Sequence, residues 1–226
     1  PRLVKENPRR GVIIQAIYRS NFVLFGLPLT VSVFGDVASS VAAMVVTVVI
    51  TIYNTTSVVI LEMFNSEGKT DVKTILVNVV KNPLLQGAMV GLVFFFLGIH
   101  VPKSLLTPIA AFADATSPVA LFVLGGTLHF NAIRGNLKYL VPALSLKLLV
   151  LPAVMLALGY AFGLRDLELF LLVAIYGTPV AAASYPMAQN MGGDGELAGQ
   201  FVVISTVVAV GTLFGWIFFM KSVGLI

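Results

Sequence analysis

The sequence predicts an all-α protein whose helices cross a membrane about seven times. Of its 226 residues, 58% are hydrophobic and 11% are charged, and the mean hydropathy is +0.99. A soluble domain carries about a quarter charged residues. Seven apolar runs reach the ~20 residues that a helix needs to cross the hydrocarbon core, and only Arg19 and Lys147 interrupt them. The runs cover residues 11–35, 37–61, 82–102, 115–133, 139–164, 169–193 and 197–220.

Several other classes of protein do not fit this sequence. There is no cysteine for disulfides or thiolate metal sites, and the polar, basic first ten residues do not resemble a secretory signal peptide. His100 and His129 are predicted at opposite faces of the membrane, where they cannot share a metal. No catalytic Ser-His-Asp grouping or HExxH motif occurs, and no Asp or Glu lies within the predicted spans. We therefore expect neither an enzyme nor a cofactor.

The basic residues predict how the chain is oriented. On one side of the membrane lie Arg2, Lys5, Arg9, Arg10, Arg19, Lys69, Lys73, Lys81, Arg134 and Lys138. On the other side lie only Lys103, Arg165 and Lys221. The positive-inside rule makes the first side cytoplasmic, so the amino end is expected inside and the carboxyl end outside. Because the net charge of +4 comes from loops, it indicates topology and does not predict nucleic-acid binding.

The first and sixth runs are both interrupted by residues that weaken a helix. The first contains YRSNFVLFGLPLTVSVFG, with Asn21 and Pro28 seven residues apart, and the sixth contains YGTPVAAASYPMAQNMGG, with Pro179 and Pro186 at the same spacing. The sixth run comes five spans after the first, an odd number, so the two runs enter the membrane from opposite faces. Prolines that merely bend membrane helices are the alternative for either run alone. Broken segments at matching positions of two repeats are instead typical of a transporter's binding site.

Small polar side chains flank both breaks. A broken helix exposes backbone N–H groups where its second half begins, and the helix dipole adds roughly half a positive charge there. Two such ends would bind a carboxylate, with neighbouring side chains supplying further hydrogen-bond donors. The candidate substrate-binding residues are Ser20, Asn21, Pro28, Thr178, Pro179, Ser184 and Gln189.

Two further spans carry polar groups with two possible roles each. Tyr53 and Asn54 in the second run either bind substrate, for which Asn54 is the candidate, or form hydrogen bonds between helices. Lys147 is the only charge well within a span. It acts as a counter-ion or coupling group, or else it reaches a headgroup or a carbonyl that Pro152 frees. Near the end of the last run, Trp216 fits an interfacial aromatic belt, a packed core or a lipid-facing position.

The motifs, taken in order, resemble the auxin efflux carrier family, which includes the plant PIN auxin carriers and bacterial malonate or malate permeases. The resemblance runs from about Arg9 to Gly211 and rests on RSNFVLFGLP with a later YN, KNPLLQGAMVGL, TSPVALFVLGGTL and GTPVAAASYPMAQNMGGDGELAG. It implies ten spans in two inverted repeats of five, a fold like that of the sodium/bile acid symporters. The broken fourth and ninth spans of such carriers cross at the substrate site. Asn21 and Pro28 match the fourth span, Pro179 matches the ninth, and Ser20 stands where plant members have proline.

This resemblance assigns residues 1–64 to the end of a first repeat and residues 83–226 to a second repeat of five spans, with the three preceding spans missing. Between them, residues 65–82 are predicted to form a cytoplasmic amphipathic linker, since Val72, Ile75 and Val79 recur beside lysines.

The expected function is that of a secondary transporter in the bacterial inner membrane. It moves a small organic anion, such as a dicarboxylate or an auxin-like carboxylate, by alternating access. The sequence leaves open whether a proton or a sodium ion is coupled and whether the chain forms a homodimer; membrane lipid is its other expected partner. The alternatives are a channel-like or receptor-like seven-span protein and a non-transporting assembly partner of a carrier.

Overall fold

The computed structural model describes the chain except for residues 1–3, 65–72, 74–76, 78–79, 82 and 128–129. The described part is built from helices, with one isolated antiparallel bridge between Ser20 and Val180. The helices are α1 (Asn7–Tyr18), η1 (Phe22–Gly26), α2 (Leu27–Phe34), α3 (Val37–Met63), α5 (Pro83–Phe96), α6 (Lys103–Thr127), α7 (Phe130–Ser145), η2 (Leu146–Val150), α8 (Leu151–Ala161), α9 (Asp166–Gly177), α10 (Ser184–Asn190) and α11 (Gly195–Ser222). The η segments are π-helical, and each continues directly into the α-helix that follows it.

Within the described residues, four helices are long and apolar enough to cross a membrane: Ala38–Met63, Lys103–Gly126, Ala132–Ala161 and Gly195–Ser222. The predicted all-α polytopic class is confirmed, but a count of seven spans is not. Two of the other predicted spans are the interrupted ones, which the structure divides into α1, η1 and α2 and into α9 and α10. The remaining span, α5, has 14 residues.

The middle of the chain departs from the predicted span limits. The helix predicted over 115–133 begins at Lys103 instead, and it ends at Thr127. Asp114 therefore lies inside a candidate span, so the expectation that no Asp or Glu would do so was wrong. It failed because a single charge was taken as a span boundary, whereas the helix continues through it. The linker predicted over 65–82 lies largely outside the described residues.

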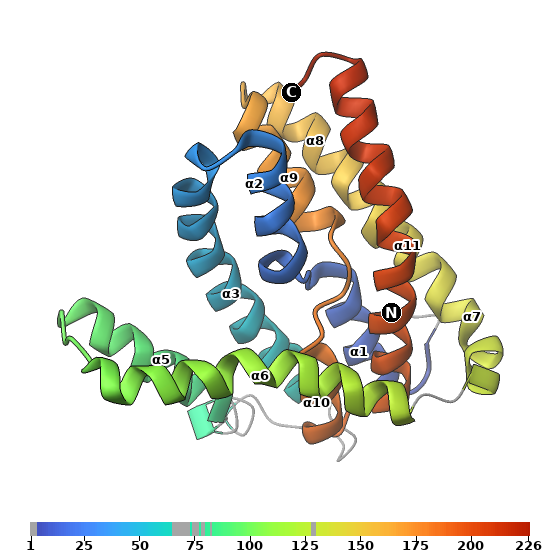
Figure 1. Ribbon diagram of the computed structural model, residues 1–226. Helices are drawn as coiled ribbons and strands as arrows, with labels where there is room; N and C mark the ends of the chain where they lie inside the picture. Colours follow the sequence, from blue (N-terminus) through green and yellow to red (C-terminus); the bar gives the residue numbers. More distant parts are fainter. Residues whose placement is uncertain (1–3, 65–72, 74–76, 78–79, 82, 128–129) are drawn as a thin grey trace.

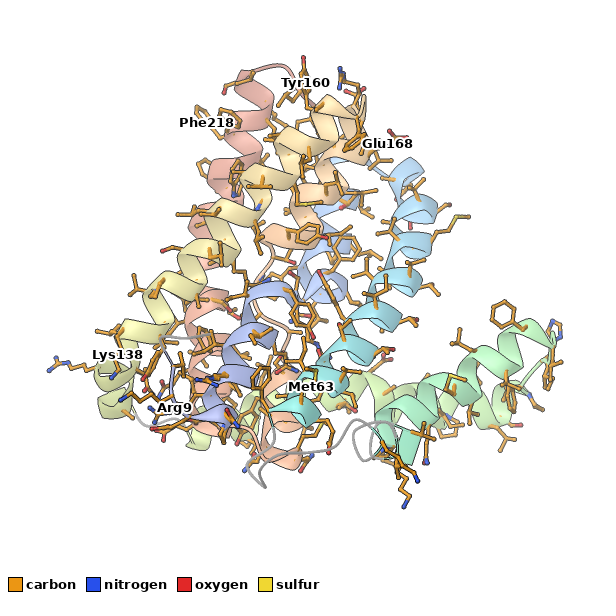
Figure 2. The ribbon with its side chains drawn as sticks, turned by 180° about the vertical axis from the view of Figure 1, so that it is seen from behind. Arg9, Met63, Lys138, Tyr160, Glu168 and Phe218 are labelled. Atoms are coloured by element: carbon orange, nitrogen blue, oxygen red, sulfur yellow. The ribbon has the colours of Figure 1, made fainter. Side chains whose placement is uncertain are left out.

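The helices form an upright bundle with a separate pair at its base. Figure 1 shows α2, α8, α9 and α11 running side by side, with α3 next to α2, while α6 crosses the lower end and α5 extends outward. Figure 2 places Arg9, Lys138 and Met63 at the lower end and Tyr160, Glu168 and Phe218 at the upper end. Most large side chains on the outside are apolar, Phe122 and Phe214 among them, as expected for a surface in contact with lipid.

Two apolar clusters form the core of the bundle. One joins α1, the end of α3, α7, α10 and the start of α11, around Val12, Leu140 and Phe201. The other joins η1, the start of α3, α8 and α9, around Phe22 and Phe170. In sequence, the interruptions near Asn21 and Pro179 fall between the segments that enter one cluster and the segments that enter the other. The polar backbone of the breaks is thus held between two packed layers.

Candidate functional site

The two interrupted segments meet through their backbones. Ser20 pairs with Val180 in an antiparallel bridge, and the Asn21 N–H donates to the Pro179 carbonyl at 2.7 Å. The Val180 N–H donates to Ser205 Oγ of α11 at 2.9 Å. Each segment therefore satisfies part of the polar backbone that a break exposes in a membrane. As predicted, the breaks near Asn21 and Pro179 meet in the structure.

Each segment becomes helical again directly after the crossing. In η1 the first helical bond runs from the Phe25 N–H to the Asn21 carbonyl at 3.1 Å, and α10 starts at Ser184. The first N–H groups of a helix have no partner within it, and they carry the positive end of the helix dipole. The amino ends of η1 and α10 are thus brought to one place.

A pocket of about 770 Å³ opens at these helix ends. Its walls come from the break and η1, the middle of α3, the segment that leads into α10, and α6. The residues that line it are Arg19, Ser20, Asn21, Phe22, Val23, Leu24, Val49, Ile50, Tyr53, Asn54, Ala113, Asp114, Thr116, Pro118, Leu121, Ala181, Ala182 and Ala183. The volume is in the range of small-molecule sites, and the wall is mostly apolar with a few polar groups, as in such sites generally.

Lys147 is completely buried beside the crossing. Its Nζ donates to Ser20 Oγ at 2.6 Å, and it lies in η2, the π-helical segment between α7 and α8. Since Lys147 Nζ is the donor in this bond, the Ser20 hydroxyl is the acceptor, and its own hydrogen is left for a different acceptor. Ser20 lines the pocket, so Lys147 orients a hydrogen-bond donor at the pocket wall.

The carbonyl that Pro152 frees is satisfied by another residue. Proline removes the bond to the residue four positions earlier, here Leu148. Trp216 Nε1 donates to the Leu148 carbonyl at 2.9 Å. Lys147 therefore does not bind this carbonyl, which was one of the roles considered for it. Trp216 packs against the core around Phe170.

Arg19 is the charged residue of the site that the sequence interpretation missed. It was counted among the cytoplasmic loop charges, but its side chain is only 5% exposed and it lines the pocket. One Nη donates to Asn54 Oδ1 at 2.9 Å, and the other contacts Met187 Sδ. The available signal was its position: Arg19 directly precedes Ser20 and Asn21 inside an apolar run.

The second-run candidates also reach the site, in supporting roles. Asn54 lines the pocket and holds Arg19, while the Tyr53 hydroxyl donates to the Ile175 carbonyl of α9 at 3.2 Å. The Tyr53 ring also packs edge-on against Tyr18, with ring centres 5.9 Å apart. These contacts hold α3 against both interrupted segments.

The other candidates are spread around the crossing. Thr178 and Ser184 are buried, and their hydroxyl oxygens have no hydrogen-bond partner among the described residues. Pro28 lies in the first turn of α2, where its missing N–H leaves the Leu24 carbonyl without that partner. Gln189 is exposed near the end of α10, close to Gly195, and it does not line the pocket. Of the predicted residues, only Ser20, Asn21 and Asn54 form part of the pocket wall.

At the lower end of the bundle, Arg9 ties α1 to the start of α11. Its Nε donates to Asp194 Oδ2 at 2.9 Å, and Asp194 caps α11 by accepting from the Leu197 N–H. Burial by itself lowers the pKa of Arg9, but its bonds with Asp194 and Tyr139 outweigh this, and the pKa is raised above its ordinary value. The Gly-rich stretch around Asp194 thus serves as a helix cap.

Residues 3–217 match the family described as "Membrane transport protein". The chain is also similar to a "Putative malonate transporter" of Rhizobium meliloti (strain 1021), at 29% identity over 147 residues. That match covers 62% of this chain and 44% of the relative, so the chain spans less than half of the relative's length in this comparison.

Proposed function

We propose that this chain, which belongs to the membrane transport protein family, carries a small organic anion across the membrane as part of a secondary transporter. The anion is a carboxylate, with a dicarboxylate such as malonate as the first candidate, in keeping with the name of the similar rhizobial protein. The bacterial inner membrane is the proposed location.

The observation that carries this proposal is the pocket at the crossing. It is lined by the start of η1, by the segment leading into α10, and by the Arg19 side chain. Half-helix amino ends that face a midplane site are the arrangement by which transporters bind anionic groups. A carboxylate placed there meets positive potential from both helix ends and a hydrogen-bond donor from Ser20.

Transport requires that this pocket open to each side in turn. We propose that one group of helices rocks against the other around the fixed crossing, as in carriers with broken helices. The lower end, with Arg9 and Lys138, is the proposed cytoplasmic side, since basic loops favour that side. Lys147 sits beside the site as a counter-ion, and the coupled ion, if one is used, is a proton or sodium.

Substitution at the two breaks tests the proposal. Asn21→Ala and Pro179→Ala, each made in the intact protein, should weaken binding of radiolabelled malonate about tenfold, because both residues shape the backbone that faces the anion. Expression and monodisperse elution should be unchanged. Asn190→Ala is the matched control, since Asn190 is exposed at the end of α10 and does not line the pocket.

Three outcomes count against the proposal. Unchanged affinity in both variants would remove the substrate from the crossing. Wild-type protein that binds none of a panel of mono- and dicarboxylates would remove the anion itself. Flux through proteoliposomes that rises linearly with concentration, without saturation, would favour the channel-like alternative.

A further inference from the structure

We infer that Arg19 is the residue by which the pocket selects a dicarboxylate over a monocarboxylate, by binding the second carboxylate of the substrate. The inference rests on the proposed function, because it assigns a role within the same anion site. It concerns specificity. A single carboxylate is able to bind the helix ends and Ser20, and Arg19 supplies a separate binding group for a second carboxylate.

Arg19 has unused hydrogen-bonding capacity in the right place. A guanidinium group has five N–H donors in a planar fork, and among the described residues the Arg19 side chain has one bond to Asn54 Oδ1 and one contact with Met187 Sδ. A thioether sulfur is a weak acceptor. Since the side chain lines the pocket, the remaining donors are available to a ligand there.

The charge of Arg19 is not neutralised by the described part of the protein. Its side chain is 5% exposed, and the ion pairs found among the described residues belong to Arg9. Asp114 of α6 also lines the pocket but forms no ion pair with Arg19. A buried cation without a counter-ion is costly, and a carboxylate that enters the pocket removes that cost. An arginine is also suited to bind a carboxylate with two parallel hydrogen bonds.

The pocket has a second, separate group of donors for the other carboxylate. Arg19 and Ser20 are consecutive residues in extended backbone, so their side chains leave the chain in opposite directions. Arg19 points to α3 and α10, whereas Ser20 points to Lys147 of η2. Arg19 and the start of η1 both line the pocket, so a ligand with two carboxylates is able to place one on Arg19 and the other at the helix end, and a monocarboxylate is able to use only one of them.

The competing explanation is that Arg19 is a clamp that holds α1, α3 and α10 together through Asn54 and Met187. A clamp supports the shape of the whole pocket, so its loss weakens every ligand to a similar extent. A residue that binds the second carboxylate affects only ligands that have one. The ratio of affinities for two ligands therefore separates the two roles.

The experiment measures dissociation constants of malonate and acetate for the intact protein by calorimetry, in wild type, Arg19→Gln, Arg19→Lys and Arg134→Gln. Arg134 is the matched control, an exposed arginine of α7 outside the pocket. Arg19→Gln should weaken malonate about 30-fold, the loss expected for a charge-assisted bidentate contact, and acetate less than about threefold. Arg19→Lys should give an intermediate loss, because an ammonium keeps the charge but not the fork.

An equal loss for malonate and acetate, or no loss for either, overturns the inference while leaving the proposed function intact. Wild-type protein that binds neither anion overturns the proposed function, and this inference with it. If Arg19→Gln does not elute as a folded, monodisperse protein, the comparison of malonate with acetate is made with Arg19→Lys. An unchanged malonate-to-acetate preference in that variant contradicts the inference.

Discussion

At the scale of single residues, the site combines two buried cations with few acceptors. Lys147 is fully buried and Arg19 nearly so, and the hydrogen bonds found for them go to neutral atoms of Ser20 and Asn54. Neither group has a carboxylate partner in the described part of the chain. Burying such charges lowers the stability of the folded protein. Proteins keep buried charges where the charge has a function.

Replacing Lys147 by methionine should separate function from stability. Lys147→Met replaces a buried amine by an apolar group of similar volume, so we expect no loss in thermal stability. Malonate affinity should fall about tenfold, because Ser20 is no longer held as a donor at the pocket and one positive charge is lost. Binding and melting are measured on the same samples.

Lys138→Met is the control for this comparison, since Lys138 is exposed on α7 and should leave both quantities unchanged. Full affinity in Lys147→Met would assign Lys147 a role outside substrate binding.

At the scale of elements, the sequence was sufficient to predict the breaks but not their surroundings. Asn21, Pro28 and Pro179 are visible because proline and small polar residues are conspicuous in apolar runs, and the structure brings the breaks together. Arg19 was misplaced because the charge count does not distinguish a loop from a break. Asp114 was missed because α6 continues through a charge that sequence reasoning took as its boundary. Such positions depend on tertiary packing that no local pattern contains.

The contact between η2 and α11 gives a prediction at this scale. Trp216 donates to the Leu148 carbonyl, which has lost its helical partner to Pro152. Trp216→Phe should therefore lower the free energy of unfolding by about 1–2 kcal/mol, the cost of a buried carbonyl left without a donor. The melting of the purified protein in detergent is the measurement.

A double-mutant cycle tests the cause. In Pro152→Ala the backbone N–H is restored at position 152, so Trp216→Phe should cost less in that background than in wild type. An equal cost in both backgrounds would mean that the tryptophan stabilises the protein through packing alone.

At the scale of the whole molecule, the crossing lies between two apolar clusters, and the outer surface of the bundle is also apolar. The packed clusters around Phe201 and Phe170 hold the interrupted segments from either side. Residues 3–217 match a membrane transport family, which confirms the resemblance to the auxin efflux carriers that the motifs indicated. The number of spans was not predictable in the same way, because hydropathy counts an interrupted helix as a continuous one.

The measurement that tests the central claim most directly is protection of the pocket by substrate. The chain has no cysteine, so a single Val23→Cys places one thiol at the wall of the pocket, where Val23 is 41% exposed. Phe162→Cys is the control, in an exposed position just after α8.

If the anion binds at the crossing, saturating malonate should slow modification of Val23→Cys by a hydrophilic thiol reagent at least about fivefold, as expected for a ligand that fills its pocket. The rate for Phe162→Cys should not change. Equal rates for Val23→Cys with and without malonate, in protein that still binds malonate, would contradict the account and place the substrate elsewhere.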